Sequence, residues 1–461
     1  MASDTPAQVQ SLVVYQVFPR NHGRTGRLSD VTADLDRIAA LGVDVVYLLP
    51  IHPIGERARK GSLGSPFAIR DYRSIHPDLG DEADFAELVS QAHARGLLVI
   101  IDVVFNHTAQ DSLLLAEHPE LFHTDAEGRP VSSVPEWSDI VDFRHPNPVV
   151  DELLLDSLRE WVRRGVDGFR CDAATLVPLA FWTRARRELA DLKPGLLWIA
   201  ETVHPFLIER RRAEGVPVAS DAELYQAFDI EYTYDVWGIW QAAVTGQVPV
   251  GRYLEMLRWQ DVALPANHAK LRHVENHDNF RIMRFAPSRG QALAWTALAA
   301  FCRGPFMVFA GQESAARRWP SLFEPDPIPW GDYELTGFIA TLARLKKHPA
   351  MAEGAFLVLD DEPCVQLAWG RPAQGVLAAT PSGAGLYGVF NVDAATGRVP
   401  VQLPDGRYRD LLGGDHLVVA DGEIPAPKGA VVVEFTDRFA VTRWQTPLMD
   451  LFLHVEALGD D

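Results

Sequence analysis

Short apolar runs alternate with amphipathic stretches along most of the chain. Residues 12–18, 43–49 and 97–105 are apolar and rich in β-branched side chains, which is typical of buried strands. Between them, residues 29–41, with their first serine as N-cap, and residues 82–95 repeat apolar side chains at helical spacing. Strand–helix units of this kind predict a parallel sheet covered by helices.

The same alternation continues to residue 350. It predicts strands at 166–172, 196–202, 225–230, 271–276 and 305–310, and helices near 149–164, 178–191, 251–259, 289–302 and 334–347. Eight strands with intervening helices favour an α/β fold of the (β/α)₈ barrel type over an open doubly wound sheet. The absence of a G-x-G-x-x-G sequence after the first strand also disfavours a dinucleotide-binding fold.

Two segments depart from this pattern. Residues 108–145 are polar and rich in Gly and Pro, and they are too long for an ordinary βα loop, so we expect an inserted domain after the third strand. Residues 351–440 contain short strands separated by Gly, Pro and Asp turns, which predicts a C-terminal antiparallel β-sandwich. The barrel would then comprise residues 1–107 and 146–350, and residues 441–461 would form a tail of unassigned role.

Composition and charge exclude several classes of function. The 461 residues carry a formal net charge of −19, which disfavours nucleic acid and anionic membranes as partners. Cys171, Cys302 and Cys364 form no C-x-x-C pair, so neither a disulfide framework nor a thiolate zinc site is predicted. The first residues lack a basic signal-peptide region and no apolar run is long enough to span a membrane, so we expect a cytoplasmic protein.

Polar side chains end several predicted strands, and the carboxyl ends of barrel strands form the active-site face. These residues are Asn106, His107, Arg170, Asp172, Glu201, Asn276, His277 and Asp278. A single acid in such a place more often caps a helix or pairs with a neighbour. So many polar groups on one rim predict a catalytic site instead.

Two of these carboxylates suit glycosidic bond cleavage with retention. Asp172 and Glu201 end consecutive strands, which lie about 4.8 Å apart, and a retaining pair needs about 5–5.5 Å between its carboxyl groups. Arg170 precedes Asp172 by one pleat repeat and is expected to keep that carboxylate ionised as the nucleophile. Burial after the apolar run 196–200 is expected to raise the pKa of Glu201, the general acid.

The remaining rim residues suit the binding of the reacting sugar. Asp278 would stabilise the positive charge that develops on the sugar ring. His107 and His277 would donate hydrogen bonds to its hydroxyl groups.

Four motifs occur in order along the chain, DVVFNH (102–107), GFRCDAA (168–174), AETVH (200–204) and VENHD (274–278). With these motifs the sequence resembles the α-amylase family, glycoside hydrolase family 13, and the similarity extends over almost the whole chain. The resemblance implies the roles nucleophile for Asp172, acid/base for Glu201, transition-state stabiliser for Asp278, and sugar binding for His107, Arg170 and His277. It also identifies residues 108–145 as the family's domain B and the β-rich tail as its domain C.

The resemblance extends to two loops near the predicted site. Phe67 and Tyr72 lie in the segment that matches the family's sugar-stacking loop, although packing within the loop is an alternative role. Ala68 stands where exo-acting members tend to carry an acidic residue, which disfavours a closed exo pocket. Residues 20–27, RNHGRTGR, replace an early acidic metal loop, so no metal is expected there.

The chemistry requires no cofactor, but the family's structural Ca²⁺ would use Asn106, with Asp142 as a second ligand. The alternative that Asn106 only hydrogen-bonds the backbone of the inserted segment stays open, because calcium takes 6–8 oxygens.

These features lead to the hypothesis of a retaining α-glucoside hydrolase acting on α-1,4-linked oligosaccharides such as maltodextrins. A transglycosylase, a sucrose-acting enzyme or an isomerase of the same family is the nearest alternative. A metal-dependent hydrolase with His107, Asp172, Glu201 and His277 as ligands is more remote, because Arg170 would repel the ion. A sugar-binding relative without activity is the remaining alternative, and the sequence does not predict the oligomeric state.

Overall fold

A computed structural model of the chain describes residues 5–441 except 135 and 374. All but the first residue of the predicted tail, 441–461, therefore lies outside the described residues.

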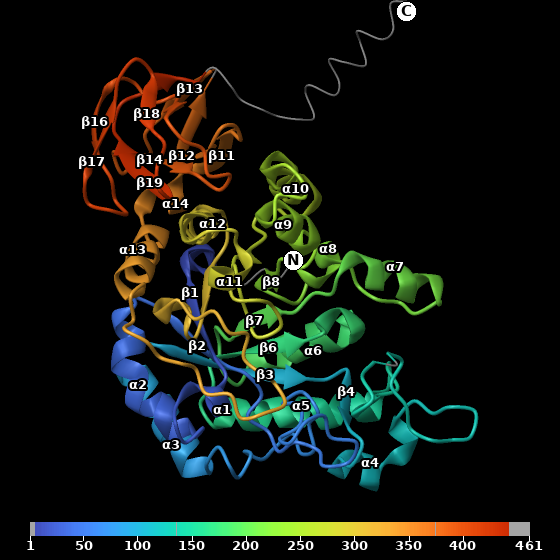
Figure 1. The fold of residues 1–461 in the computed structure, drawn as a ribbon. Coiled ribbons are helices and arrows are strands. Elements are labelled where there is room, and N and C mark those ends of the chain that lie inside the picture. Colours follow the sequence, from blue (N-terminus) through green and yellow to red (C-terminus); the bar gives the residue numbers. More distant parts are fainter. Residues whose placement is uncertain (1–4, 135, 374, 442–461) are drawn as a thin grey trace, which may run out of the picture.

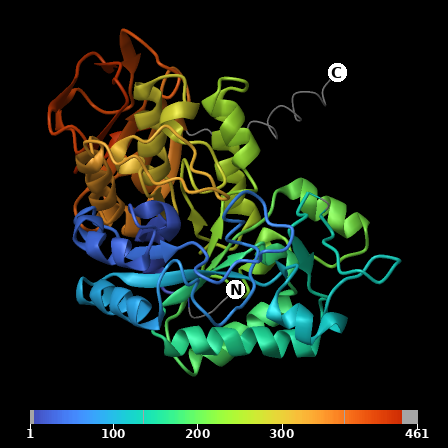
Figure 2. The same ribbon diagram turned by 60° about the horizontal axis from the view of Figure 1, so that its bottom comes forward.

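Eight parallel strands form a barrel, which confirms the predicted (β/α)₈ fold (Figures 1 and 2). In spatial order they are β10 (Phe306–Phe309), β1 (Val13–Val17), β2 (Val45–Leu48), β3 (Leu98–Val104), β6 (Gly168–Asp172), β7 (Leu197–Ala200), β8 (Ile230–Tyr232) and β9 (Lys270–Leu271). A parallel bridge between Arg272 and Phe306 closes the sheet between β9 and β10. Nearly every strand residue is buried, because a barrel strand packs on side chains inside and on helices outside.

Helices follow the strands and cover the outside of the barrel (Figure 2). The longer ones are α2 (Leu28–Ala40), α3 (Glu82–Ala94), α5 (Pro148–Arg163), α6 (Leu179–Ala190), α7 (Pro205–Ala213), α9 (Trp237–Val244), α10 (Val250–Ala263), α12 (Arg289–Phe301) and α13 (Thr336–Lys346). The sequence predicts seven of these helices to within a few residues of their bounds, and α7 and α9 are additional to the prediction. The predicted N-cap Ser29 is wrong, because buried Leu28 already begins the helix.

The predicted strand 225–230 is also wrong. A short helix, α8 (Asp221–Leu224), leads into turns, and only Ile230 of the predicted range joins the strand β8. Tyr225 and Phe228 are buried and apolar because they pack in the core, and the hydroxyl of Tyr225 donates to the carbonyl oxygen of Ala269. These residues are apolar because they are buried, and the sequence alone does not distinguish such a buried turn from a buried strand.

The segment after β3 folds back on itself beside the barrel (Figure 1). Its strands β4 (His107–Ala109) and β5 (Ile140–Asp142) pair antiparallel, with His107 opposite Asp142. Between them lie the helix α4 (Leu113–Glu117) and a single 3₁₀ turn at Pro119–Leu121. This pairing holds one end of the insertion against the rim of the barrel.

A C-terminal antiparallel sheet follows the barrel, as predicted. Its six strands are β11 (Ala355–Asp360), β12 (Val365–Ala373), β13 (Val376–Ala378), β14 (Gly385–Phe390), β19 (Ala430–Phe435) and β20 (Phe439–Ala440). Two strand pairs, β15 (Arg398–Pro400) with β18 (Glu423–Pro425) and β16 (Gly406–Arg409) with β17 (His416–Val419), add apolar side chains to the core on one face of this sheet. Across the described residues, none of the helices has the length and apolar character needed to cross a membrane.

Candidate active site

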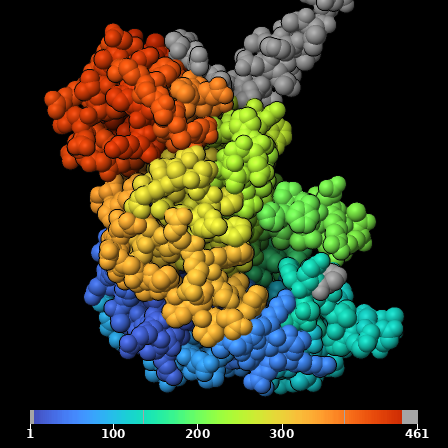
Figure 3. All heavy atoms as spheres, in the orientation of Figure 1, coloured from blue at the N-terminus to red at the C-terminus, as the bar shows by residue number. Residues whose placement is uncertain are grey.

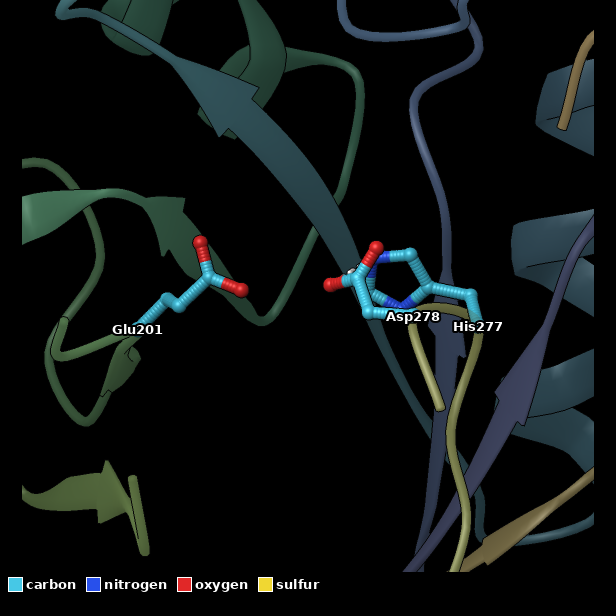
Figure 4. A group of neighbouring side chains, drawn as sticks. All are labelled: Glu201, His277 and Asp278. Atoms are coloured by element: carbon cyan, nitrogen blue, oxygen red, sulfur yellow. Dashed lines mark ion pairs between the residues drawn. The ribbon is translucent and has the colours of Figure 1, made fainter. Parts of the chain in front are cut away.

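The carboxyl ends of the strands bring most of the predicted site residues together. Arg170 and Asp172 end β6, and Glu201 directly follows the neighbouring strand β7. His277 and Asp278 lie in the loop after β9, which only β8 separates from β7 in the sheet. The carboxyl groups of Glu201 and Asp278 point toward one another in Figure 4.

Arg170 links the two carboxylates proposed for catalysis. Its fully buried guanidinium donates from Nη1 to Asp172 Oδ1 at 3.1 Å and from Nη2 to Glu201 Oε1. Nη1 also donates to Asp102 Oδ1 at 2.8 Å, and Tyr47 donates its hydroxyl to Asp102 Oδ2 at 2.6 Å. Asp102, itself held by Tyr47, therefore fixes the position of the guanidinium.

Asp102 did not stand out in the sequence as a site residue. Its signal is present, because it is a lone carboxylate inside the apolar run 97–105, and a carboxylate so deeply buried needs a charged partner.

Burial sets the proton affinity of both carboxylates. It raises the pKa of Asp172 to about 7, against the opposing effect of Arg170, with a further rise from Asp102. It raises the pKa of Glu201 to about 8, again against Arg170, with the charge of Asp172 adding to the rise. The shift at Glu201 has the expected direction. Arg170 lowers the pKa of Asp172, as expected of a cation that keeps this carboxylate ionised, but desolvation outweighs the single guanidinium and the net shift is upward.

Glu201, His277 and Asp278 form a cluster of three neighbouring side chains in the site. Each offers a ligand atom within 4.8 Å of the others. Nε2 of His277 lies 3.1 Å from Asp278 Oδ2, and burial lowers the pKa of His277 to about 4, so its imidazole is neutral near pH 7. Three such groups can hold a metal ion in principle. Arg170 already donates to Glu201 here, however, and a guanidinium at this place opposes a second cation.

The predicted aromatic residues occupy different depths. Phe67 is half-buried and stacks on His277, with ring centroids 5.3 Å apart and planes 22° apart. Its ring also lies 5.7 Å from Cζ of Arg170, so it borders the site. Tyr72 is only 5% exposed and donates its hydroxyl to the backbone oxygen of His107 at 2.6 Å. Its contacts position His107 from behind.

His107 and the two predicted calcium ligands lie where the insertion joins the barrel. His107 is buried, burial lowers its pKa, and its Nδ1 lies 3.2 Å from Nδ2 of Asn106. Asp142 Oδ2 accepts from the backbone N–H of Ser133 at 2.7 Å. Its other oxygen, Oδ1, is buried and has no hydrogen-bond partner among the described residues. This orphaned oxygen is the observation that favours a cation at this place.

Comparisons with known proteins find similar sequences and structures. Residues 15–124 match the family model "Alpha amylase, catalytic domain", and residues 376–433 match "Bacterial Alpha amylase C-terminal domain". An α-amylase from Lactobacillus plantarum is similar in structure, with a TM-score of 0.87 and 38% identity over 93% of this chain and 100% of that one. The maltogenic α-amylase AmyB from Thermotoga neapolitana has a TM-score of 0.80 and 30% identity over 92% and 99% of the two chains.

Two curated relatives are longer than the region they share with this chain. The α-amylase MalA from Haloarcula japonica is 27% identical over 91% of this chain and 62% of its own length. An α-1,4-glucan:maltose-1-phosphate maltosyltransferase from Myxococcus xanthus is 34% identical over 41% of this chain and 32% of its own length. The chain thus spans between about a third and three fifths of these relatives.

Proposed function

The chain belongs to the α-amylase family, and from this premise we propose that it is a retaining hydrolase of α-1,4-glucosidic bonds in maltodextrins and related oligosaccharides. The observation that carries the proposal is the buried guanidinium of Arg170, which contacts Asp172 and Glu201 on neighbouring strands. The carboxyl group of Asp278 faces that of Glu201. Two adjacent carboxylates with raised pKa values and a third facing them supply every group that a double displacement needs.

The proposed reaction has two steps. In the first, ionised Asp172 attacks the anomeric carbon of the sugar, while protonated Glu201 gives its proton to the departing glycosidic oxygen. A β-glucosyl ester on Asp172 results. In the second, Glu201 removes a proton from water, the water oxygen attacks the anomeric carbon, and Asp172 leaves as a carboxylate. Two inversions give overall retention of the α configuration.

The neighbouring residues favour the charged transition states. Asp278 opposes the positive charge that develops on the ring, and neutral His277 and His107 donate hydrogen bonds to sugar hydroxyls. Phe67, stacked on His277, offers its other face to the apolar side of the sugar. Arg170 donates to both carboxylates and holds them in position.

The test of the proposal compares products and rates of the wild type with Asp172→Asn and Glu201→Gln, using maltoheptaose, chromatography and anomeric NMR. We expect short α-anomeric maltodextrins from the wild type and a loss of kcat of about 10³-fold or more in either variant. The matched control is Glu117→Gln, which neutralises an exposed carboxylate of the insertion and leaves kcat unchanged. Unimpaired turnover in Asp172→Asn would contradict the assignment.

Transfer to a sugar rather than water is the second candidate, and the similarity to maltosyltransferases favours it. Both reactions use the same ester on Asp172 and differ only in the acceptor. Products longer than maltoheptaose in the same experiment would establish transfer. In a parallel incubation with sucrose, isomerised or cleaved sucrose would indicate the other activities of the family.

We further propose that Asn106 and Asp142 hold a structural Ca²⁺ where the insertion meets the barrel, with no part in the chemical steps. The buried, unpartnered Oδ1 of Asp142 supports this, and backbone oxygens and water must complete the 6–8 ligands that calcium requires.

Removal of this ion is expected to lower the melting temperature. Scanning fluorimetry should show a fall in Tm with EDTA, recovery with CaCl₂, and no dependence on either in Asp142→Asn. Glu127→Gln, an exposed position of the same insertion, should keep the wild-type response. An identical Tm for the wild type with and without EDTA would refute the calcium proposal.

We also propose that the protein works in the cytoplasm. Cys171, Cys302 and Cys364 are all free and buried, which supports a reducing compartment.

A further inference from the structure

A cavity opens on the same rim of the barrel, beside the loops that follow β1 and β2. Its volume is about 1020 Å³, and residues 18–27, 50–63 and 70–79 supply most of its lining, with Pro325 and Pro327 from the chain after β10. In Figure 3 the N-terminal part of the chain, in blue, adjoins the orange chain that follows β10 on one face of the molecule. None of Asp172, Glu201 and Asp278 lines this cavity.

The charge of this cavity opposes that of the protein as a whole. Its lining contains Arg20, Arg24, Arg27, Arg59 and Arg70 together with His52 and His76, and the carboxylates Glu56, Asp71 and Asp78. Arginines outnumber carboxylates here, whereas the whole chain has a net charge of −19. A concave surface with an excess of positive charge raises the local concentration of small anions, even on a protein whose overall charge is negative.

Only Arg70 of these five arginines has an ion pair among the described residues, and two of the other four, Arg20 and Arg59, are also held in place by the backbone. Neither Arg20 nor Arg59 lies within 4.0 Å of a carboxylate oxygen in the part of the chain that the structure describes. Nη1 of Arg20 donates to the backbone oxygens of Gly64 and Leu322, at 3.1 and 3.2 Å. Arg59 donates to the backbone oxygens of Gly55 and Ser62, at 3.3 and 3.2 Å. Backbone carbonyls therefore orient both guanidinium groups without neutralising either one.

The two guanidinium groups also repel each other. Burial, and then the charge of Arg59, lower the pKa of Arg20 to about 10, and only Asp78 acts in the other direction. The same two arginines help to lower the pKa of His76. Arg20 is half-buried and Arg59 is exposed, and neither has a carboxylate partner among the described residues; a half-buried guanidinium without a counter-ion beside a second positive charge is unfavourable. A bound anion would relieve the repulsion.

We propose that this cavity binds a phosphate group, free or carried on a sugar, through Arg20 and Arg59. The planar guanidinium fork matches phosphate oxygens, and each of these side chains keeps N–H groups without an acceptor in the described residues. The apolar side chains of Phe18, Ile54 and Leu63 line the same cavity and suit the C–H face of a sugar ring. The volume is sufficient for such a ligand.

The assignment is independent of the proposed hydrolysis, because it concerns binding outside the catalytic residues. The test is isothermal titration calorimetry of the intact protein with inorganic phosphate, glucose 6-phosphate and glucose at low ionic strength. We expect both phosphate compounds to bind and glucose not to bind. Arg59→Gln should weaken binding about tenfold or more, and Arg59→Lys should weaken it less.

Three further proteins make the result decisive. Arg407→Gln removes an exposed arginine of the C-terminal sheet and should bind like the wild type. Asp172→Asn should also bind like the wild type, because its carboxylate does not line the cavity. Arg24→Gln changes another exposed arginine of the cavity lining and should also weaken binding. It replaces Arg59→Gln in the test if that variant does not fold.

Tighter binding of glucose 6-phosphate than of inorganic phosphate would establish a sugar phosphate as the ligand, and equal affinity would establish free phosphate. The proposal is overturned if the wild type binds neither, or if Arg59→Gln binds as tightly as Arg407→Gln. Loss of binding in Asp172→Asn would also overturn it, since the phosphate would then lie at the catalytic carboxylates.

Discussion

Desolvation and charge compete at single residues of the catalytic site. Arg170 is fully buried and contacts three carboxylates, Asp102, Asp172 and Glu201, so one positive charge is shared among three acids. Burial then raises the pKa of Asp172 to about 7 and that of Glu201 to about 8. The order of the two values leaves the nucleophile ionised and the general acid protonated in the same range of pH.

The activity should therefore follow a bell-shaped pH profile. Below about pH 7 Asp172 gains a proton and loses its nucleophilicity, and above about pH 8 Glu201 loses the proton that the leaving group needs. Because the two groups interact, the limbs report the pair rather than either residue alone. The measurement is kcat/KM of a chromogenic maltoside across this range. Glu201→Gln should keep the acidic limb and lose the alkaline one, and an alkaline limb that persists would contradict the assignment.

At the scale of elements, the close approach of β6 and β7 places the two carboxylates. Gly168 begins β6, and a Cβ at this position would lie 2.1 Å from the backbone oxygen of Leu197 in β7. The strands can pair here only because this side chain is missing. Asp172 and Glu201 follow on these same two strands, so their separation depends on this contact.

Gly168→Ala is expected to destabilise the protein by about 1–3 kcal/mol and to lower kcat, because the strands must separate to admit the methyl group. Gly238→Ala in α9 is the matched control. Its Cβ would meet no atom within 4 Å, and it should leave stability unchanged or raise it by about 0.5–1 kcal/mol. Urea titration and kcat on maltoheptaose measure both effects. Equal stability and activity of the two variants would refute this account of the strand spacing.

At the scale of the whole molecule, the C-terminal sheet shares a core with the barrel. Val365, Leu367 and Trp369 of β12 belong to the same apolar cluster as the barrel, whereas the alternate residue Ala368 belongs to a separate cluster on the other face. Trp369 Nε1 donates to the backbone oxygen of Phe301 in α12 at 2.8 Å. The two parts are therefore expected to stabilise each other.

Phe390→Ala should lower the free energy of unfolding by about 3–5 kcal/mol, because its ring is fully buried and lies 5.3 Å from that of Phe301. The loss should occur for the barrel as well as the sheet, and kcat at moderate temperature should be retained. Val418→Ala, at a side chain that is 53% exposed in the same region, should have little effect. Denaturant unfolding, followed by tryptophan fluorescence and by residual activity, tests this. If Phe390→Ala lost activity at the same denaturant concentration as the wild type, the shared core would be contradicted.

The sequence determined the features that depend on local pattern. Continuous apolar runs such as 97–105 can be buried on both faces only as barrel strands, and strand ends must lie on one rim, so the pattern alone places Arg170, Asp172 and Glu201 together. Tertiary packing decided the rest. The buried turn at 225–229 has the apolar pattern of a strand but no pairing partner, and the partnership of Asp102 with Arg170 depends on which strands become neighbours. The raised pKa of Asp172 and the unpartnered charges of Arg20 and Arg59 also depend on which residues the fold brings together. Desolvation and Coulomb energy depend on distances between residues far apart in the chain, and only the folded structure sets those distances.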